Sequence, residues 1–409
     1  MNRLNGLNRI NRLNGPPKGG GISWASYWAT RKPSALIVTG MRDTEIDFAW
    51  TDNSAGDCSF SIYRSTDGIN YASVGTTVAG DTTYTATGLT AGNLYYFYVK
   101  GVKSGNESTA TNIYDTRFKI TVDTTNAGSA ADTFILPTAG AGVYNYFVDW
   151  GDGGAEQNVV VNTSQTKVYA ASGTYQIKIR GTFPRIYFAN GGDKAKLMTI
   201  DNWGNIKWSS MLQAFRGCAN MQGAWLDCPN MTTASFSMNN MFWICVKFNY
   251  SISNFNTSTV TDMTEVLLGA TSFNQSVANF NTANVTSMAG MFYGATSFNQ
   301  SVANFNTANV TSMAEMFRNA SSFKQSLATF TLGAGLTTVS SMCQGCNINA
   351  TGTTANYDAT LVAWAAQDPP NSLAFHGGSS QYSAAGGGTA ARASLIADDL
   401  WTITDGGPI

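Results

Sequence analysis

The sequence predicts a mainly β protein in which two β-sandwiches precede a solenoid of repeats and a small α/β cap. Residues 34–200 contain short segments of alternating apolar and polar residues separated by turn residues, as the strands of sandwiches do. The twenty residues GATSFNQSVANFNTANVTSM occur at 269–288 and again, unchanged, at 294–313. A repeat at a fixed period of 25 residues is typical of solenoids, because one unit cannot bury its own apolar face but stacked units can.

The composition favours an extracellular or virion protein over a cytosolic enzyme. The 409-residue chain has a formal net charge of −1, so it has no overall field that would attract nucleic acid. Only 12% of its residues are charged, about half the usual share, and Asn, Thr, Ser and Gly carry most of the polarity. No apolar run is long enough to span a bilayer, and the first residues lack the continuous apolar segment of a signal peptide. We therefore expect no nucleic-acid partner, no membrane insertion and no export signal.

Motifs for catalysis or metal binding are missing from the sequence, so we expect that the protein is not an enzyme and binds no cofactor. The sequence contains no G-x-S-x-G, P-loop or H-E-x-x-H motif, and its one histidine is His376. Cys343 and Cys346 form a C-x-x-C without a second pair at metal-ligand spacing, so buried free thiols are favoured over a zinc site. A glycosidase with two distant carboxylates is the weak alternative.

Residues 1–33 are predicted to form a basic arm that anchors the chain to a partner. They contain no acidic residue, and apolar residues recur every three positions before Pro16. Trp24 and Trp28 favour docking, because exposed tryptophan is unusual unless a partner covers it. The alternative is a disordered basic tail. The residues predicted to anchor the arm are Arg3, Leu4, Leu7, Arg9, Ile10, Arg12, Leu13, Trp24 and Trp28.

Residues 34–115 are predicted to form the first sandwich. The segment TEIDFAWTD alternates as a half-buried strand does, and Asp67-Gly68 joins two strands as a hairpin turn. Trp50, the strand IYRSTDG, and Leu89 six residues before Tyr95 resemble a fibronectin type III domain. The resemblance implies that Tyr95 forms the tyrosine corner of that fold and that the domain is a spacer or binding module.

Residues 116–200 are predicted to form the second sandwich. A W-G-D-G turn follows a strand at Trp150–Gly153, and a Y-x-x-x-G-x-Y strand begins at Tyr169. These motifs resemble the polycystic-kidney-disease (PKD) type of immunoglobulin-like domain. Asp149 and Asp152 lack the partner cluster of a calcium site, so a turn that hydrogen-bonds its own backbone is favoured there.

Residues 201–350 are predicted to form about six stacked rungs, where a rung is one repeat. The alternation in FNQSVANF predicts a short strand, and TSMAGMF has helical or 3₁₀ spacing. Phe, Met, Val and one small residue are expected to point inward in columns that recur from rung to rung. These columns are Phe248, Phe273, Phe298 and Phe323; Phe255, Phe280, Phe305 and Phe330; Met238, Met263, Met288 and Met313; Val260, Val285 and Val310; and Cys218, Cys245, Ala270, Ala295 and Ala320.

The repeats also keep asparagines and place two cysteines in the column of small residues. Asn254, Asn279 and Asn304 recur every 25 residues, and a second column of asparagines lies two residues later. Their amides are expected to hydrogen-bond to one another along the stack. We weigh this structural role above sugar binding. Cys218 and Cys245 fit as small apolar residues, and a disulfide between them is the alternative.

Two positions vary between the otherwise identical copies, and we expect them to lie on an exposed edge that recognises a partner. Gly290 is replaced by Glu315 and Tyr293 by Arg318, while the core columns stay fixed. Aromatic and arginine side chains dominate binding hot spots, so a column that contains them is a candidate binding surface. The alternative is that surface positions drift freely. The candidate recognition residues are Trp243, Glu265, Leu268, Tyr293, Glu315 and Arg318.

The unit MFYGATSFNQSVANFNTANVTSM resembles the BspA-like leucine-rich repeats of bacterial surface proteins, and residues 351–409 resemble the cap that follows them in Bacteroidetes-type proteins. The resemblance implies an attachment or protein-binding role. In the cap, Leu361 and Trp364 share one helical face, Leu395 and Ile396 share another, and a last strand is expected to cover the open end of the solenoid.

Together these features predict a phage virion structural protein of the tail-fibre, tail-associated or head-fibre type, exposed on the particle of a Bacteroidetes-infecting virus. Cellular proteins with such repeats carry export signals, whereas virion proteins are assembled in the cytoplasm and released by lysis. The arm would bind other virion proteins, and the solenoid would bind a host surface glycan or protein. A homotrimer is compatible with this hypothesis, since fibres are commonly trimeric. The alternatives are a capsid decoration protein with a weak adhesive role and a bacterial cell-surface adhesin.

Overall fold

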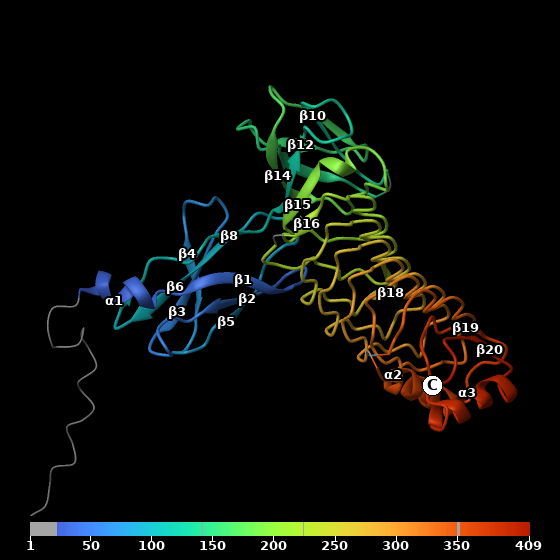
Figure 1. Cartoon of the computed structure of the whole chain (residues 1–409). Coiled ribbons are helices and arrows are strands. Elements are labelled where there is room, and N and C mark those ends of the chain that lie inside the picture. Colours follow the sequence, from blue (N-terminus) through green and yellow to red (C-terminus); the bar gives the residue numbers. More distant parts are fainter. Residues whose placement is uncertain (1–22, 141, 224, 350–351) are drawn as a thin grey trace, which may run out of the picture. The chain divides into compact units, whose positions relative to one another are not determined.

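The computed structural model describes residues 23–140, 142–223, 225–349 and 352–409 (Figure 1). The chain divides into two compact units, residues 1–116 (unit 1) and residues 117–409 (unit 2), and each is described by itself. Both are mainly β. The predicted anchoring residues from Arg3 to Leu13 lie outside the described part of the chain. Within that part, no helix combines the length and the apolar character that crossing a membrane requires.

Unit 1 contains the first predicted sandwich. One sheet has the order β1-β2-β5, and the other has the order β4-β3-β6-β7, with β8 also paired to β6. Alternate side chains of the strands point between the sheets, and Phe48, Trp50 and Phe97 are each at most 5% exposed. The strands are β1 (Ser34–Met41), β2 (Ile46–Thr51), β3 (Ser59–Ser65), β4 (Ala72–Thr76), β5 (Thr83–Ala86), β6 (Tyr96–Lys103), β7 (Asn106–Glu107) and β8 (Tyr114–Asp115).

Two local predictions for this sandwich are confirmed by hydrogen bonds. The Tyr95 hydroxyl accepts the main-chain N–H of Thr90 at 3.2 Å, which is the contact of a tyrosine corner. In the turn between β3 and β4, the Asp67 carboxylate accepts the N–H groups of Ile69 and Asn70, each at 2.8 Å. The turn residues therefore satisfy their own backbone, as expected at Asp67-Gly68.

The helix α1 (Trp24–Arg31) belongs to unit 1, which corrects the prediction that Trp28 docks on a partner, whereas the docking predicted for Trp24 stays a prediction. Trp28 is 5% exposed, and its indole lies so close to Gly101 that a Cβ there would be 2.9 Å from it. The Tyr27 hydroxyl donates to the Asp57 carboxylate at 2.7 Å. Trp24 is half-buried and packs edge-on against Tyr27. The chain's own sandwich therefore buries the Trp28 side chain, which we expected a partner to bury.

Unit 2 begins with the second predicted sandwich. Its main sheet has the order β12-β11-β14-β9-β15-β16, and β10 pairs with β13 in a small second sheet. The Asp149 carboxylate accepts the N–H of Gly151 at 2.9 Å and Asp152 accepts that of Gly154 at 3.1 Å, so the self-bonded turn is confirmed. The strands are β9 (Phe118–Asp123), β10 (Thr133–Leu136), β11 (Asn145–Asp149), β12 (Gln157–Val159), β13 (Gln165–Val168), β14 (Thr174–Thr182), β15 (Leu197–Asn202) and β16 (Gln222–Gly223).

The second sandwich and the repeats share one continuous sheet. Strand β15 pairs antiparallel with β9 of the sandwich and parallel with β16 of the repeats. The domain boundary that we expected between residues 200 and 201 therefore falls inside β15. A 3₁₀ turn, η1 (Lys194–Lys196), precedes β15, and the fully buried Lys196 ammonium donates to three main-chain oxygens of residues 129–133 at 2.7–3.0 Å. These bonds fix the start of the repeats to the sandwich.

The repeats stack as parallel rungs, and residues 203–349 are called the repeat stack below (Figure 1). Strands β17 (Phe236–Ser237) and β18 (Val260–Asp262) pair in parallel, and bridges from Asp262 to Ser287 and from Ser287 to Ser312 continue the same line. The N–H groups of Met288, Gly290, Phe292 and Gly294 donate to the next rung, whereas those of Met291, Tyr293 and Ala295 donate three residues back. This alternation produces successive turns, so the helical or 3₁₀ segment expected at TSMAGMF is not formed.

The predicted core columns are confirmed, because every residue in them is at most 3% exposed. The phenylalanines of one column stack from rung to rung, with the Phe273 and Phe298 rings 6.0 Å apart. The strand expected in FNQSVANF is not formed. Instead, the N–H of Asn274 donates to the side chain of Asn249 in the preceding rung at 2.9 Å, so a side chain takes the place of a main-chain ladder.

The asparagine columns also differ from the expectation of amide-to-amide bonding. The Asn254 and Asn279 amides donate to main-chain oxygens of the preceding rung at 2.8 and 3.0 Å. In the second column, Asn281 accepts the N–H of Ala283 within its own rung at 3.1 Å. These amides form hydrogen bonds with main-chain groups of the irregular turns. If the amides bonded only to one another, those main-chain groups would be left without partners.

The cap ends the stack with α2 (Ala355–Ala365), α3 (Gly387–Ala397) and the parallel strands β19 (Ala374–His376) and β20 (Thr402–Thr404). A bridge from Val339 to Phe375 joins the last rung to β19, and the last strand, β20, pairs with β19. The open end is therefore covered by β19, which corrects the expectation that the last strand covers it. Leu361, Trp364 and Leu395 are fully buried. Ile396 is 38% exposed, which corrects the expectation that it shares a face of α3 with Leu395.

Candidate recognition edge of the repeat stack

The first variable column occupies a left-handed backbone position in every rung. The φ angle is +54° at Glu265, +61° at Gly290 and +58° at Glu315. A Cβ at Gly290 would lie 3.0 Å from Cγ of Glu265, so the glutamate side chain of one rung runs over the glycine of the next. Glycine adopts this conformation freely and other residues adopt it at a cost, so Glu265 and Glu315 are held in a conformation that only Gly290 adopts without strain.

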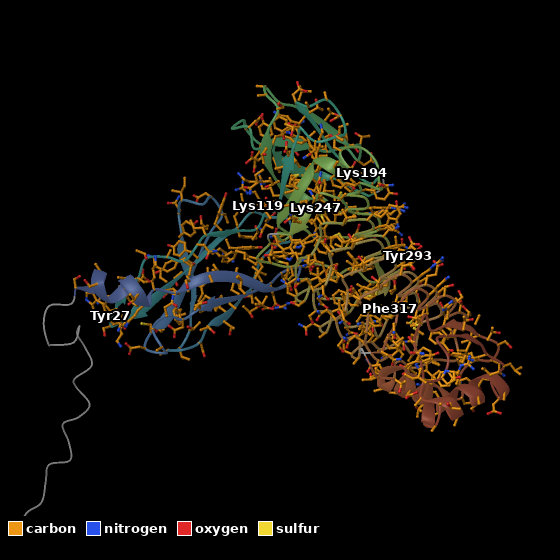
Figure 2. The ribbon with its side chains drawn as sticks, viewed as in Figure 1. Tyr27, Lys119, Lys194, Lys247, Tyr293 and Phe317 are labelled. Atoms are coloured by element: carbon orange, nitrogen blue, oxygen red, sulfur yellow. The ribbon has the colours of Figure 1, made fainter. Side chains whose placement is uncertain are left out.

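The second variable column forms a straight line along one edge of the stack. The main-chain oxygens of its members accept the N–H of the preceding rung at 2.6–2.7 Å, and this ladder keeps their side chains in register. The residues of this column are Trp243, Leu268, Tyr293 and Arg318. Figure 2 labels Tyr293 on this part of the stack.

Side chains of neighbouring rungs contact one another along this edge. The Arg318 guanidinium lies over the Tyr293 ring, 5.5 Å from its centroid, and forms an ion pair with Glu315. Each of the six predicted recognition residues is half-buried rather than exposed, which corrects the expectation of a fully exposed edge. Burial of the ring and guanidinium faces fixes their orientation, so their outer parts form a preorganised surface.

One further residue of this edge, Arg216, was missed by the sequence reasoning. Gly217 donates its N–H to the Trp243 oxygen at 2.7 Å, which places Arg216 in the same column as Trp243, and its guanidinium carbon is 4.4 Å from the Trp243 ring centroid. Arg216 and Trp243 are 27 residues apart instead of 25, so the 25-residue period did not align Arg216 with this column. Below, the recognition edge means Arg216, Trp243, Glu265, Leu268, Tyr293, Glu315 and Arg318.

The other chemically interesting side chains have structural roles. His376 accepts the N–H of Gly378 through Nδ1 at 3.1 Å, and its main-chain oxygen accepts the N–H of Cys343. All six cysteines are buried, and none of them forms a disulfide. A hydrogen bond with Cys346, together with burial, raises the pKa of the Cys343 thiol, and burial alone is the main cause that raises the pKa of Cys218. Both thiols are therefore kept protonated and poorly nucleophilic.

Among the described residues, no three His, Cys, Asp or Glu side chains gather in a way that could hold a metal ion. The recognition edge offers aromatic rings, guanidinium groups and two carboxylates, which suit binding by stacking, hydrogen bonding and charge.

Parts of the chain are similar to known proteins. Residues 209–330, within the repeat stack, match the family described as "Mycoplasma protein of unknown function, DUF285". No curated protein matches the chain. A fibronectin type III-like protein from Clostridium thermocellum is 25% identical over 21% of this chain and 91% of that one, with a TM-score of 0.19. A two-domain fibronectin type III segment of chicken tenascin is 15% identical over 37% of this chain and 92% of that one, with a TM-score of 0.20. The chain thus has fibronectin type III-like structural neighbours and a repeat region related to a family without a stated function.

Proposed function

We propose that this protein is a non-enzymatic attachment protein that presents its repeat stack to a host surface. The observation that carries the proposal is the recognition edge, where Trp243, Tyr293 and Arg318 are held in register in one column of the repeat stack. Trp, Tyr and Arg are the residue types that contribute most binding energy at interfaces, and fixed side chains lose little entropy when a partner binds. We assign the repeats to the BspA-like leucine-rich-repeat type, which fits an attachment role.

By analogy, we place the protein on a phage particle as a tail fibre, tail-associated or head-fibre protein of a Bacteroidetes-infecting virus. Sandwich domains that precede a binding stack are consistent with a spacer that carries a receptor-binding region away from a particle. A bacterial cell-surface adhesin is the alternative, because the same arrangement would serve on an envelope.

The experiment is a binding assay of the labelled, purified chain on a panel of Bacteroidetes cells. We expect saturable binding to at least one strain, and we expect the double variant Trp243→Ala/Tyr293→Ala to lose about tenfold or more in affinity. The control is Thr286→Ala/Thr311→Ala, which changes exposed threonines of the same region. Equal affinity of the Trp243→Ala/Tyr293→Ala variant and wild type would refute the assigned role of the edge.

A further inference from the structure

The first rungs of the repeat stack carry positive charge with little opposing charge at their surface. Between residues 202 and 261 the sequence has three basic residues, Lys207, Arg216 and Lys247, and one acidic residue, Asp227. Asp227 is 0% exposed and accepts two main-chain N–H bonds at 2.7 and 2.8 Å, so its carboxylate is fully occupied inside the protein. Asp262 and Glu265 follow in the next rung, so the excess of positive charge is confined to the rungs before residue 262, where it favours an anionic ligand.

Arg216 stands out among these cations because it has an aromatic partner and no carboxylate. Its guanidinium stacks on Trp243, and in the described part of the chain no acidic side chain pairs with it. Its buried Nε also has no hydrogen-bond partner there. Arg318, at the far end of the recognition edge, instead pairs with Glu315. A guanidinium that is fixed by an indole and lacks a carboxylate is preorganised to bind one from a ligand through two N–H groups.

A second positive group lies beside Arg216. The Lys194 side chain crosses Gly217, where a Cβ would be 3.1 Å from Lys194 Cδ, and its ammonium donates to the Asn190 oxygen at 3.0 Å. The Lys247 ammonium donates to the Asn220 amide oxygen at 3.0 Å. In Figure 2, Lys194, which precedes the repeat stack, and Lys247, which lies within it, are both nearer than Tyr293 to the sandwich of unit 2. Both ammonium groups contact neutral oxygens, so both keep their full charge for a ligand.

We infer that Arg216, Trp243 and Lys194 form a subsite for a saccharide that carries carboxylate groups, such as a uronic-acid polymer. The inference rests on the proposed attachment function and names the ligand class for one end of the recognition edge. Arg216 would bind the carboxylate, and the neighbouring amide side chains suit sugar hydroxyls. A nucleic acid is disfavoured, because its affinity depends on neutralising many phosphates and this chain has only a few cations here and a net charge of −1.

The test measures binding of the full chain to polygalacturonate, alginate and hyaluronan, with neutral dextran and double-stranded DNA as comparison probes, at low and high salt. We expect at least one carboxylated polysaccharide to bind more tightly than dextran and DNA. Arg216→Gln should lower that affinity about tenfold, the size expected for a lost charge-assisted pair, and Lys194→Gln should lower it by a smaller factor. Arg216→Lys, which keeps the charge without the planar fork, should fall between wild type and Arg216→Gln.

The matched control is Arg180→Gln in β14, which makes the same charge change away from the stack and should bind as wild type does. Thermal unfolding of each variant checks folding, and Lys194→Gln provides a second test if Arg216→Gln unfolds. Three outcomes would overturn the inference: no carboxylated probe binds better than dextran, DNA binds as tightly, or both Arg216→Gln and Lys194→Gln bind as wild type does. If these occur while Trp243→Ala/Tyr293→Ala still abolishes cell binding, the subsite is wrong and the attachment function stands.

Discussion

The buried hydroxyl of Thr282 donates to the main-chain oxygen of Asn306 at 3.0 Å and accepts the N–H of the same residue at 2.7 Å. Thr257 forms the same pair of bonds with Asn281 in the preceding rung, at 3.0 and 2.8 Å. Each threonine is 1% exposed. One side chain thus satisfies both main-chain groups of a residue in the next rung, in a region where no regular sheet is formed.

The first prediction concerns this contact between Thr282 and Asn306. Thr282→Val keeps the side-chain shape and removes both hydrogen bonds to the main chain of Asn306. We expect a loss of about 1–3 kcal/mol in the free energy of unfolding, measured by denaturant titration. The control Thr286→Val removes an exposed hydroxyl that donates only to the Thr261 oxygen, and should cost less than about 1 kcal/mol. Equal losses of stability for Thr282→Val and Thr286→Val would contradict the role assigned to the contact between Thr282 and Asn306.

The second prediction concerns the left-handed position that closes each rung. Ile244 has a φ of +52°, where the corresponding residues of later rungs are Gly269, Gly294 and Asn319. A β-branched residue is strained in this conformation and asparagine tolerates it, so Ile244→Asn should raise the stability by about 0.5–1 kcal/mol. The control is Val246→Asn in the same rung, whose φ is not positive and which should gain nothing. A lower melting temperature for Ile244→Asn than for wild type would contradict the strain argument.

The third prediction concerns the acid stability of unit 1. Hydrogen bonds from Arg42 are the main cause that lowers the pKa of Asp47, and a hydrogen bond from Lys103 is the main cause that lowers the pKa of Asp57. A carboxylate with a lowered folded-state pKa stabilises the fold above its unfolded pKa, near about 4, and loses this effect as the pH falls through the folded value. Thermal unfolding should therefore show a stability loss that begins below about pH 5.

The variant Asp47→Asn should show a smaller acid-side loss than wild type, because it lacks one of the groups that must be protonated. Asp81→Asn, which changes an exposed aspartate of the same unit, should follow the wild-type curve. If the stability of Asp47→Asn falls between pH 5 and pH 2 as steeply as that of wild type, the contact between Asp47 and Arg42 does not contribute to stability.

The fourth prediction concerns the six cysteines, all of which are buried and none of which forms a disulfide. The native protein should react very slowly with a thiol reagent such as Ellman's reagent, because burial keeps the thiols protonated and inaccessible. After denaturation without reductant, six thiols should react. A count of four would mean that one pair, such as Cys218 with Cys245, is a disulfide.

The core of the repeat stack could be predicted because its inward residues recur at a fixed period. Met288 and Phe298 have counterparts 25 residues away in neighbouring rungs, and burial of such columns follows directly from stacking. Tyr95 could be predicted for a similar reason, since Leu89 lies at the spacing of a tyrosine corner. These features depend on residue type and spacing, which the sequence contains.

The differences from expectation arise where a side chain replaces a main-chain partner or where the spacing changes. The alternation in FNQSVANF suggests a strand, but Asn249 and its equivalents accept the N–H groups that a neighbouring strand would accept. Arg216 could not be assigned to the recognition edge because its rung is two residues longer than the later ones. Trp28 was expected to contact a partner, and only the structure reveals that Gly101 leaves space for its indole.

The central claim is that the repeat stack presents its edge to a host surface from the outside of a virus particle. The most direct measurement is a cryo-EM map of purified phage particles from the source of this chain, alone and bound to host envelope. The account predicts density for both sandwiches and the repeat stack on the particle exterior, with Trp243 and Tyr293 facing the envelope in the bound state. If no particle contains the chain and the protein instead fractionates with a bacterial envelope, the virion assignment is wrong and the adhesin alternative holds.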